Sequence, residues 1–312
     1  MKKIIVTGAF GQIGSELIPV LNDRYGKKNV VAVGHHNIPK SYDGILEKAE
    51  ITDLKKIERI IKKHNAGIIY HLVSILSAKG EKDPQLTWQV NMNGLKNILD
   101  LAVSYNLKVF WPSSIAAFGP TTPRENTPQI TVLEPTTMYG ITKMAGEGLC
   151  HYYFLKYSLD VRSLRYPGII SWKTEPGGGT TDYAVAIFYE AIIKGKYRCF
   201  VKKETILPMM YMDDAVQATI KLMEAPAQKI TIRTSYNLAA ISFRADELAQ
   251  EIQKHLPLKV EYVPDHRQKI ADSWPKSIDD SFARRDWGWR HRYDLAKMVS
   301  AMLKNLRKKL NK

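Results

Sequence analysis

The chain has 312 residues, which is enough for one or two domains with a large buried core. Hydrophobic residues make up 45% of it and charged residues 25%, and no apolar run is long enough to span a bilayer. The formal net charge is +15, but the lysines lie on the polar sides of amphipathic patterns, without the interleaved aromatic residues that stack on bases. We therefore expect neither nucleic acid nor a membrane as a partner. Two cysteines are too few for a disulfide framework, so we expect no metal site and a cytoplasmic location.

Short apolar runs alternate with amphipathic patterns over residues 1–165. The expected strands are Lys3–Thr7, Asn29–Val33, Ile45–Lys48, Gly67–Leu72, Lys108–Pro112 and Val161–Arg165. The expected helices are Gln12–Arg24, Asp53–His64, Pro84–Tyr105 and Thr137–Tyr157. Apolar strands that alternate with helices predict an α/β fold, with a doubly wound parallel sheet of the Rossmann type.

The alternation ends after Tyr166, where residues 167–183 are rich in glycine and read as a loop. Further helices are expected at Thr181–Lys194, Asp213–Glu224 and Arg244–His255, and an amphipathic stripe runs along the C-terminal tail. We predict a Rossmann domain at residues 1–165. Residues 166–312 are expected to form mainly a smaller mixed cap that binds substrate, with some segments returning to the sheet.

The segment TGAFGQIG follows the first expected strand and opens the first helix. Gly8 permits a tight turn, Gly11 lets the backbone approach a pyrophosphate, and Gly14 lets the helix pack closely on the strand. This context predicts a dinucleotide-binding turn. The alternative is a glycine-rich turn that serves packing alone.

The residue that normally distinguishes NAD from NADP is missing at the end of the second strand. Gly34, His35 and His36 stand there, with neither an acid for the ribose hydroxyls nor an arginine for a 2′-phosphate. NAD and NADP therefore both remain open. Asp53, at the start of the next helix, can cap that helix or accept from the adenine amino group, and the two roles are compatible.

A candidate catalytic group surrounds Tyr139. Lys143 follows it by four residues, which places both side chains on one face of a helix, although this spacing is common by chance. Ser114 ends the fifth strand, at the edge where open α/β sheets bind ligands. Tyr139 can act as base with Lys143 favouring its phenolate, Ser114 can bond a substrate hydroxyl, and Asn91 can support a water joined to the lysine.

Six motifs occur together in the order and approximate spacing of a known superfamily: TGAFGQIG, HLVSILS, NMNG, PSSIAAFG, YGITK and LRYPGIIS. The chain resembles the extended short-chain dehydrogenase/reductases, which have the architecture of UDP-glucose epimerase. The resemblance implies that Ser114, Tyr139, Lys143 and Asn91 are catalytic and that NAD is the cofactor. The cofactor contacts that it implies are Gly8, Gly11, Gln12, Ile13, Gly14, Asp53, Leu72, Tyr139, Lys143, Tyr166 and Ile169.

Further stretches resemble one branch of that superfamily, the short-chain-type L-threonine 3-dehydrogenases: ILSAKGEKDP, RYPGIISWKTEPGGGTTDYAV, LPMMYMDDA and KIADSWPKSIDDS. This resemblance implies oxidation of L-threonine at its β-hydroxyl to 2-amino-3-oxobutanoate, with hydride transfer to NAD and Tyr139 as base. The substrate contacts that it implies are Ser77, Ser114, Tyr139, Thr180, Thr181 and Trp274. The glycines at 177–179 are expected to form either a mobile lid or a fixed turn.

Two other functions remain as alternatives. A nucleotide-sugar epimerase or reductase would need arginines to meet the phosphates, and the candidates are Arg233, Arg267, Arg284 and Arg285. A non-catalytic dinucleotide-binding regulator is disfavoured because it has no need of Ser114, Tyr139 and Lys143. A homodimer is expected, paired through the helices at 84–105 and 137–157.

Overall fold

The large sheet has seven strands, all parallel, and it positions most of the residues discussed below. The structure is a computed structural model that describes residues 2–35 and 38–311, so the candidate cofactor contact His36 lies outside the described residues. In spatial order the strands are β3 (Ile45–Lys48), β2 (Val30–Gly34), β1 (Lys3–Thr7), β4 (Ala66–His71), β5 (Lys108–Ser114), β6 (Val161–Tyr166) and β10 (Tyr236–Asn237). The order reverses at β1, which is the hallmark of a doubly wound sheet.

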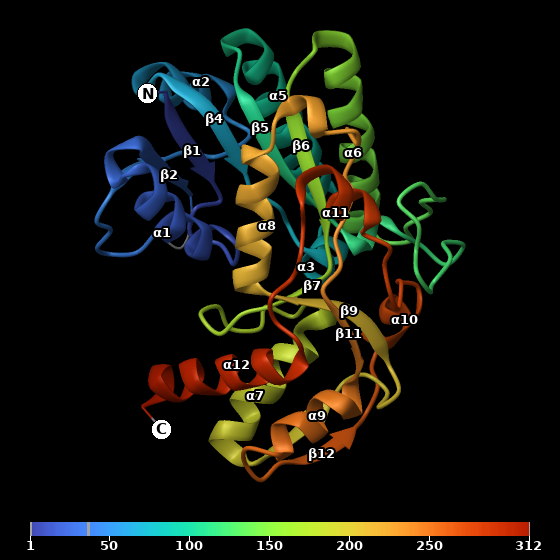
Figure 1. Cartoon of the computed structure of the whole chain (residues 1–312). Helices are drawn as coiled ribbons and strands as arrows, with labels where there is room; N and C mark the ends of the chain where they lie inside the picture. The colour runs from blue at the N-terminus through green and yellow to red at the C-terminus, as the bar shows by residue number, and fades with distance from the viewer. Residues whose placement is uncertain (1, 36–37, 312) are drawn as a thin grey trace.

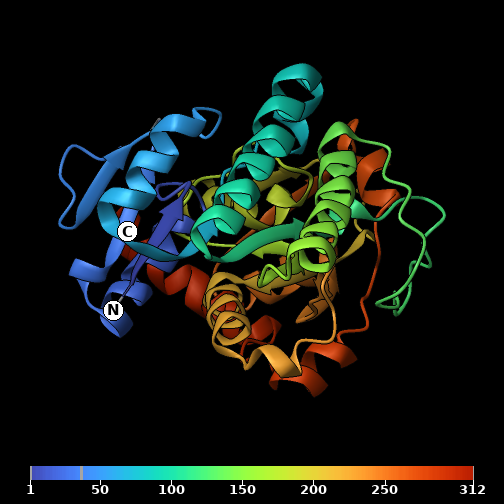
Figure 2. The ribbon, with the colours of Figure 1, turned by 90° about the horizontal axis from the view of Figure 1, so that it is seen from above.

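Helices cover both faces of this sheet, because its strands carry apolar residues on alternate sides. In β1, Ile4 and Val6 face one apolar cluster and Ile5 faces the other. The first cluster is completed by α1 (Gly14–Tyr25), α8 (Met212–Glu224) and α11 (Ser281–Trp287). The second is completed by α2 (Leu54–His64), α5 (Gly94–Tyr105) and α6 (Met138–Tyr157). The two helical layers are visible in Figure 2, and the predicted α/β fold is confirmed.

A smaller mixed region lies beyond the carboxyl edge of the sheet and has its own apolar cluster (Figure 1). Its helices are α7 (Tyr183–Lys194), α9 (Ala245–Gln253), α10 (Arg267–Asp272) and α12 (Leu295–Leu310). Its strands are β7 (Gly168–Ile170), β9 (Ile206–Tyr211) and β11 (Ile241–Arg244) in one sheet, and β8 (Lys196–Cys199) and β12 (Lys259–Tyr262) in another. Strand β10 also lies after residue 166 in the chain, but it pairs with β6 of the large sheet. The division into residues 1–165 and 166–312 stays a prediction. No helix among the described residues is long and apolar enough to cross a membrane.

Two expected elements differ from the structure. The helix expected over Pro84–Tyr105 is three pieces: α4 (Pro84–Trp88), a π-helix at Gln89–Asn93, and α5. The start of the glycine-rich segment expected to be a loop is strand β7, which pairs with β9 about forty residues later. Periodicity over a local window cannot reveal a single π turn or a partner so distant in the sequence.

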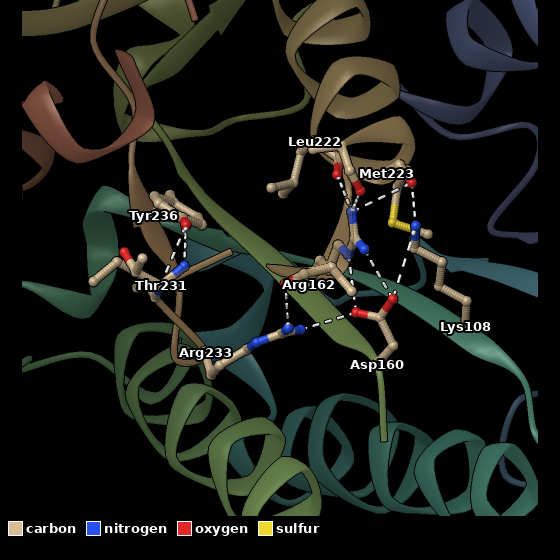
Figure 3. Close-up of polar contacts among 11 residues, drawn as sticks. Lys108, Asp160, Arg162, Leu222, Met223, Thr231, Arg233 and Tyr236 are labelled. Carbon is tan, nitrogen blue, oxygen red and sulfur yellow. Dashed lines mark hydrogen bonds and ion pairs between the residues drawn. The ribbon is translucent and has the colours of Figure 1, made fainter. Parts of the chain in front are cut away.

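The buried Arg162 and its charged partners attach the end of α8 to the amino-terminal end of the sheet (Figure 3). Arg162 of β6 donates to the carbonyl oxygens of Leu222 at 2.6 Å and Ala225 at 2.6 Å, which helix geometry leaves without partners inside the helix. Asp160 accepts from Arg162 at 2.9 Å, and Arg233 pairs with the same carboxylate. These bonds satisfy the end of α8 and fix it on the sheet.

Helix α6 approaches the end of β5 so closely that it depends on glycine at two points. A Cβ atom at Gly140 would overlap the carbonyl oxygen of Ala116, and one at Gly146 would overlap the indole ring of Trp111. Gly148, on the same helix, has no such neighbour within 4 Å. Gly140 is adjacent to Tyr139, so this close approach places the candidate base.

We expect Gly140→Ala to reduce both stability and activity, because the new methyl group must push α6 away from Ala116. Gly148→Ala is the matched control, and we expect it to stabilise the protein by about 1 kcal/mol, the usual gain for alanine over glycine in a helix. Urea unfolding of both variants measures the difference. Equal effects of the two substitutions would contradict the close approach.

Candidate active site

Two neighbouring cavities lie along the carboxyl ends of the parallel strands. One has a volume of about 150 Å³ and lies between the sheet and the mixed region. The other has a volume of about 430 Å³ and lies over the glycine turn and the ends of β2 and β4. Leu72 and Ser74 line both, so the two cavities adjoin at the sheet edge. The larger cavity, with the glycine turn in its wall, is where the fold would hold a dinucleotide.

Most residues predicted for the site line one of these cavities. The smaller cavity is lined by Gln12, Ile13, Leu72, Ser77, Ser114, Tyr139, Lys143, Tyr166, Ile169, Thr180, Thr181 and Trp274. The larger one is lined by Gly8, Gly11 and Leu72. Gly14, Asp53 and Asn91 line neither cavity. The structure thus brings together residues from both halves of the sequence at one sheet edge.

The glycine turn has the geometry that the sequence suggested. Gly8 has a φ of +70°, and a Cβ there would lie 2.9 Å from the carbonyl carbon of Leu72. A Cβ at Gly14 would overlap the carbonyl oxygen of Gly8, so Gly14 serves the close packing of α1 on the turn. Gly8 and Gly11 therefore present backbone to the larger cavity, beside the Phe10 side chain, which fits a pyrophosphate.

Tyr139, Ser114 and Lys143 meet at the smaller cavity. Burial raises the pKa of Tyr139 to about 12, and a hydrogen bond with Ser114 acts in the opposite direction. The Lys143 Nζ donates to the carbonyl oxygen of Pro112 at 2.6 Å and lies 5.4 Å from the centre of the Tyr139 ring. Burial lowers the pKa of Lys143 to about 7. The phenol and the amine are thus close enough to affect each other's charge, and burial alone favours the neutral form of both.

Asn91 makes three hydrogen bonds within the protein. Its Oδ1 accepts from the Ile75 amide at 2.8 Å, and its Nδ2 donates to the Ile75 carbonyl and the Thr142 hydroxyl, each at 3.1 Å. The π turn directs this side chain inward, and the Thr142 hydroxyl donates to the Tyr139 carbonyl at 2.8 Å. Asn91 therefore joins the segment after β4 to the helix that carries Tyr139. Its predicted link to Lys143 through a water stays a prediction.

Glu50 is an acid in the wall of the larger cavity that sequence reasoning missed. Asp53 caps α2, its carboxylate accepting from the Lys56 amide at 3.0 Å, while Glu50 lines the larger cavity. Glu50 follows β3, and its carboxylate lies 3.6 Å from the Nε2 of His35. The signal was available: parallel neighbouring strands end at the same edge, so an acid after β3 can replace one after β2.

Asp182 is a second residue that the sequence did not suggest. It lines the smaller cavity, and its carboxylate accepts from the amides of Gly178 at 2.7 Å and Gly179 at 2.8 Å. Gly178 has a φ of +95°, which favours glycine, and a Cβ there would meet no atom within 4 Å. Gly178 thus serves the backbone shape of this turn, and Asp182 fixes it beside Thr180 and Thr181.

Neither cysteine takes part in the site. Cys150 and Cys199 are both buried, and each is a free thiol. In the part of the chain that the structure describes, no group of three His, Cys, Asp or Glu side chains is placed to hold a metal ion.

Comparison with known proteins agrees with this geometry. Residues 4–239 match the model of the NAD dependent epimerase/dehydratase family. The chain belongs to this family. It is 48% identical to an uncharacterised epimerase/dehydratase of Staphylococcus haemolyticus, over 99% of each chain. The resemblance to extended short-chain dehydrogenase/reductases inferred from the motifs is confirmed.

The chain is also similar to solved structures of L-threonine dehydrogenases. A monomeric L-threonine 3-dehydrogenase from a metagenome, in its apo form, is 51% identical, with a TM-score of 0.96 over 99% of this chain and 100% of that one. A GalE-like L-threonine dehydrogenase of Cupriavidus necator, in its holo form, is 52% identical, with a TM-score of 0.95 over 97% of this chain and 99% of that one. The similarity extends over the sheet and the mixed region alike.

His71 ends β4 beneath the site and is fully buried, with its Nδ1 2.8 Å from the Thr7 hydroxyl. Burial lowers the pKa of His71 to about 3, below its ordinary value of 6.5, so protonation favours the unfolded chain. We expect the free energy of unfolding to fall by about 1.4 kcal/mol per pH unit between pH 6.5 and 3 through this residue.

Urea unfolding of the protein and of a His71→Gln variant between pH 7 and 4 measures that slope as a difference. His255 is exposed, so His255→Gln is the matched control and should keep the slope of the unsubstituted protein. Equal slopes of the free energy of unfolding against pH for the protein and for His71→Gln would contradict the low pKa of His71.

Proposed function

We propose that the chain oxidises L-threonine at its β-carbon to 2-amino-3-oxobutanoate, with NAD as hydride acceptor. The observation that carries this proposal is the meeting of Ser114, Tyr139 and Lys143 at a cavity of only about 150 Å³ beside a dinucleotide groove. Pockets for larger organic ligands commonly measure about 300–1,000 Å³, so this one suits a small substrate. The threonine dehydrogenases at 51% and 52% identity support the same choice.

Each residue of the site would have its own role in the reaction. Bound NAD would supply the carbon that accepts hydride from the β-carbon of threonine. Ser114 would bond the substrate hydroxyl, and Tyr139 would take the hydroxyl proton as the C–H bond breaks, so that a ketone forms. Lys143, 5.4 Å from the centre of the Tyr139 ring, would stabilise the phenolate while its amine is protonated.

Polar residues on the other walls suit the zwitterionic part of threonine. Ser77 and Thr180 line the same cavity and are buried, at 5% and 2% exposure, and Thr181 lies beside them. We propose that these three hydroxyls bind the ammonium and carboxylate groups. Trp274, also in the cavity wall and 5% exposed, would contact the substrate methyl group. The turn at 177–179 would close over the site by moving as one unit with Asp182.

Glu50 leads us to propose NAD in preference to NADP. Its carboxylate lines the larger cavity close to Gly34, the position at which the fold holds the adenosine ribose. A negative charge there can accept bonds from ribose hydroxyls and repels a 2′-phosphate.

The homodimer expected from the sequence stays a prediction. Helix α6 exposes Tyr152, Leu155 and Tyr157, at 52%, 67% and 47%, and α5 exposes Val103. These apolar side chains on adjacent helices suit an interface between two copies. One relative, however, is described as monomeric.

We expect absorbance at 340 nm to rise when the protein receives L-threonine and NAD, and Tyr139→Phe to reduce the rate about 10²–10⁴-fold, because the base is lost. Tyr152→Phe, an exposed tyrosine on the same helix, is the matched control and should retain the rate. D-threonine and L-serine test the substrate geometry. Dinucleotide binding without threonine oxidation would refute the proposal and favour a sugar nucleotide or a regulator.

We expect Glu50→Gln to raise kcat/KM for NADP relative to NAD by about tenfold, equivalent to about 1.4 kcal/mol, because the repulsion of the 2′-phosphate is removed. Asp53→Asn is the comparison variant: it changes the cap of α2 but lines neither cavity, so the cofactor ratio should stay the same. A change in the ratio for Asp53→Asn alone would assign cofactor choice to Asp53.

A further inference from the structure

Helix α6 meets the end of β5 at three successive turns. Tyr139, Lys143 and Glu147 are four residues apart and share one face of the helix. Tyr139 lines the smaller cavity together with Ser114, Lys143 donates to the Pro112 carbonyl at 2.6 Å, and Glu147 accepts from the Ser113 hydroxyl at 2.6 Å. Two of the last three residues of the strand are thus each hydrogen-bonded to one residue of the helix.

Arg165 of β6 holds the Glu147 carboxylate in place through hydrogen bonds. Arg165 Nε donates to Glu147 Oε1 at 2.9 Å, and a second guanidinium nitrogen donates to Oε2 at 2.7 Å. The guanidinium also donates to the Gln129 carbonyl at 3.1 Å and the Asn237 side chain at 3.0 Å. Glu147 and Arg165 are 2% and 4% exposed. Apolar residues of similar size often stabilise a core as well as such a pair does, so packing alone does not account for it.

We propose that Glu147 is a positioning residue for the proton-transfer group, which sets the place of Ser113 and Ser114 against α6 and provides the negative charge that keeps the Lys143 amine protonated. Arg165 holds the carboxylate in the orientation that both tasks require. The catalytic part of this inference rests on the proposed function, whereas the charge on Lys143 is a property of the protein alone.

The other titratable groups around Lys143 on α6, β4 and β6 supply no negative charge near pH 7. On α6 these are Tyr139, one turn before it, and Cys150, whose thiol pKa is raised by burial, so both are neutral near pH 7. On β4, His71 is neutral because burial lowers its pKa to about 3. On β6, Arg165 opposes protonation of the lysine but lies behind the carboxylate. Burial lowers the pKa of Lys143 to about 7, and Cys150 and then Glu147 act in the opposite direction. Because burial keeps the Cys150 thiol neutral near pH 7, Glu147 is the anion of these two.

The test is a direct titration of Lys143 by NMR of the protein labelled with carbon-13 at lysine Cε, with the signal assigned by its loss in Lys143→Met. We expect Glu147→Gln, which keeps the shape and an acceptor for Ser113, to lower the midpoint by about one pH unit, the effect of losing one nearby buried anion. Arg165→Gln should raise the midpoint, because a cation is removed. Arg165→Lys keeps the charge and is the matched control: its midpoint should stay nearer to that of the unsubstituted protein than the midpoint of Arg165→Gln does.

A displacement of α6 would move the Lys143 midpoint in the same direction in Glu147→Gln and Arg165→Gln. Loss of an anion and loss of a cation move it in opposite directions. An unchanged midpoint in folded Glu147→Gln, or shifts of the same sign for Glu147→Gln and Arg165→Gln, would overturn the proposal. Where one of these variants does not fold, the other decides it by comparison with Arg165→Lys. The titration needs no substrate, so it remains decisive if threonine oxidation is not observed. With threonine, the alkaline limb of kcat should move in the same direction as the midpoint.

Discussion

The site depends on how closely helix α6 approaches the end of strand β5. Gly140 and Gly146 allow that approach, because side chains there would overlap Ala116 and Trp111. At this separation the helix places Tyr139 and Lys143 against the last residues of the strand, and hydrogen bonds fix the register. The parallel sheet supplies the rest, since its strand ends bring the glycine turn and Leu72 to the same edge.

This close packing has an electrostatic consequence. Burial raises the pKa of Tyr139 to about 12 and lowers that of Lys143 to about 7, so each group by itself resists ionisation. A phenolate and an ammonium that form together stabilise each other in surroundings of low dielectric constant. The ionised pair is therefore a joint property of the two residues. A structure that aligns them, with a fixed carboxylate nearby, does more for catalysis than the basicity of either side chain alone.

Local sequence features predicted much of this arrangement. The alternation of Ile4, Ile5 and Val6 predicts a strand buried on both faces, and the glycines from Gly8 to Gly14 predict the turn, because these signals lie within a few residues of one another. The partner of β7 and the pairing of Glu147 with Arg165 could not be read in that way. Each joins segments distant along the chain, and only the folded sheet decides which of them become neighbours.

The fold is shared across a family of epimerases and dehydratases and does not determine the substrate, so the choice of substrate rests on the site itself. A nucleoside diphosphate needs cations that are free to meet its phosphates. The four arginines considered for that task are each paired with a carboxylate and line neither cavity: Arg233 with Asp160, Arg267 with Asp265, Arg284 with Asp280 and Arg285 with Asp286. The Arg124 guanidinium donates to the backbone carbonyl of Trp274 at 3.1 Å, and Trp274 lines the smaller cavity. A small space lined with hydroxyl groups is what remains, and it favours an amino acid over a nucleotide sugar.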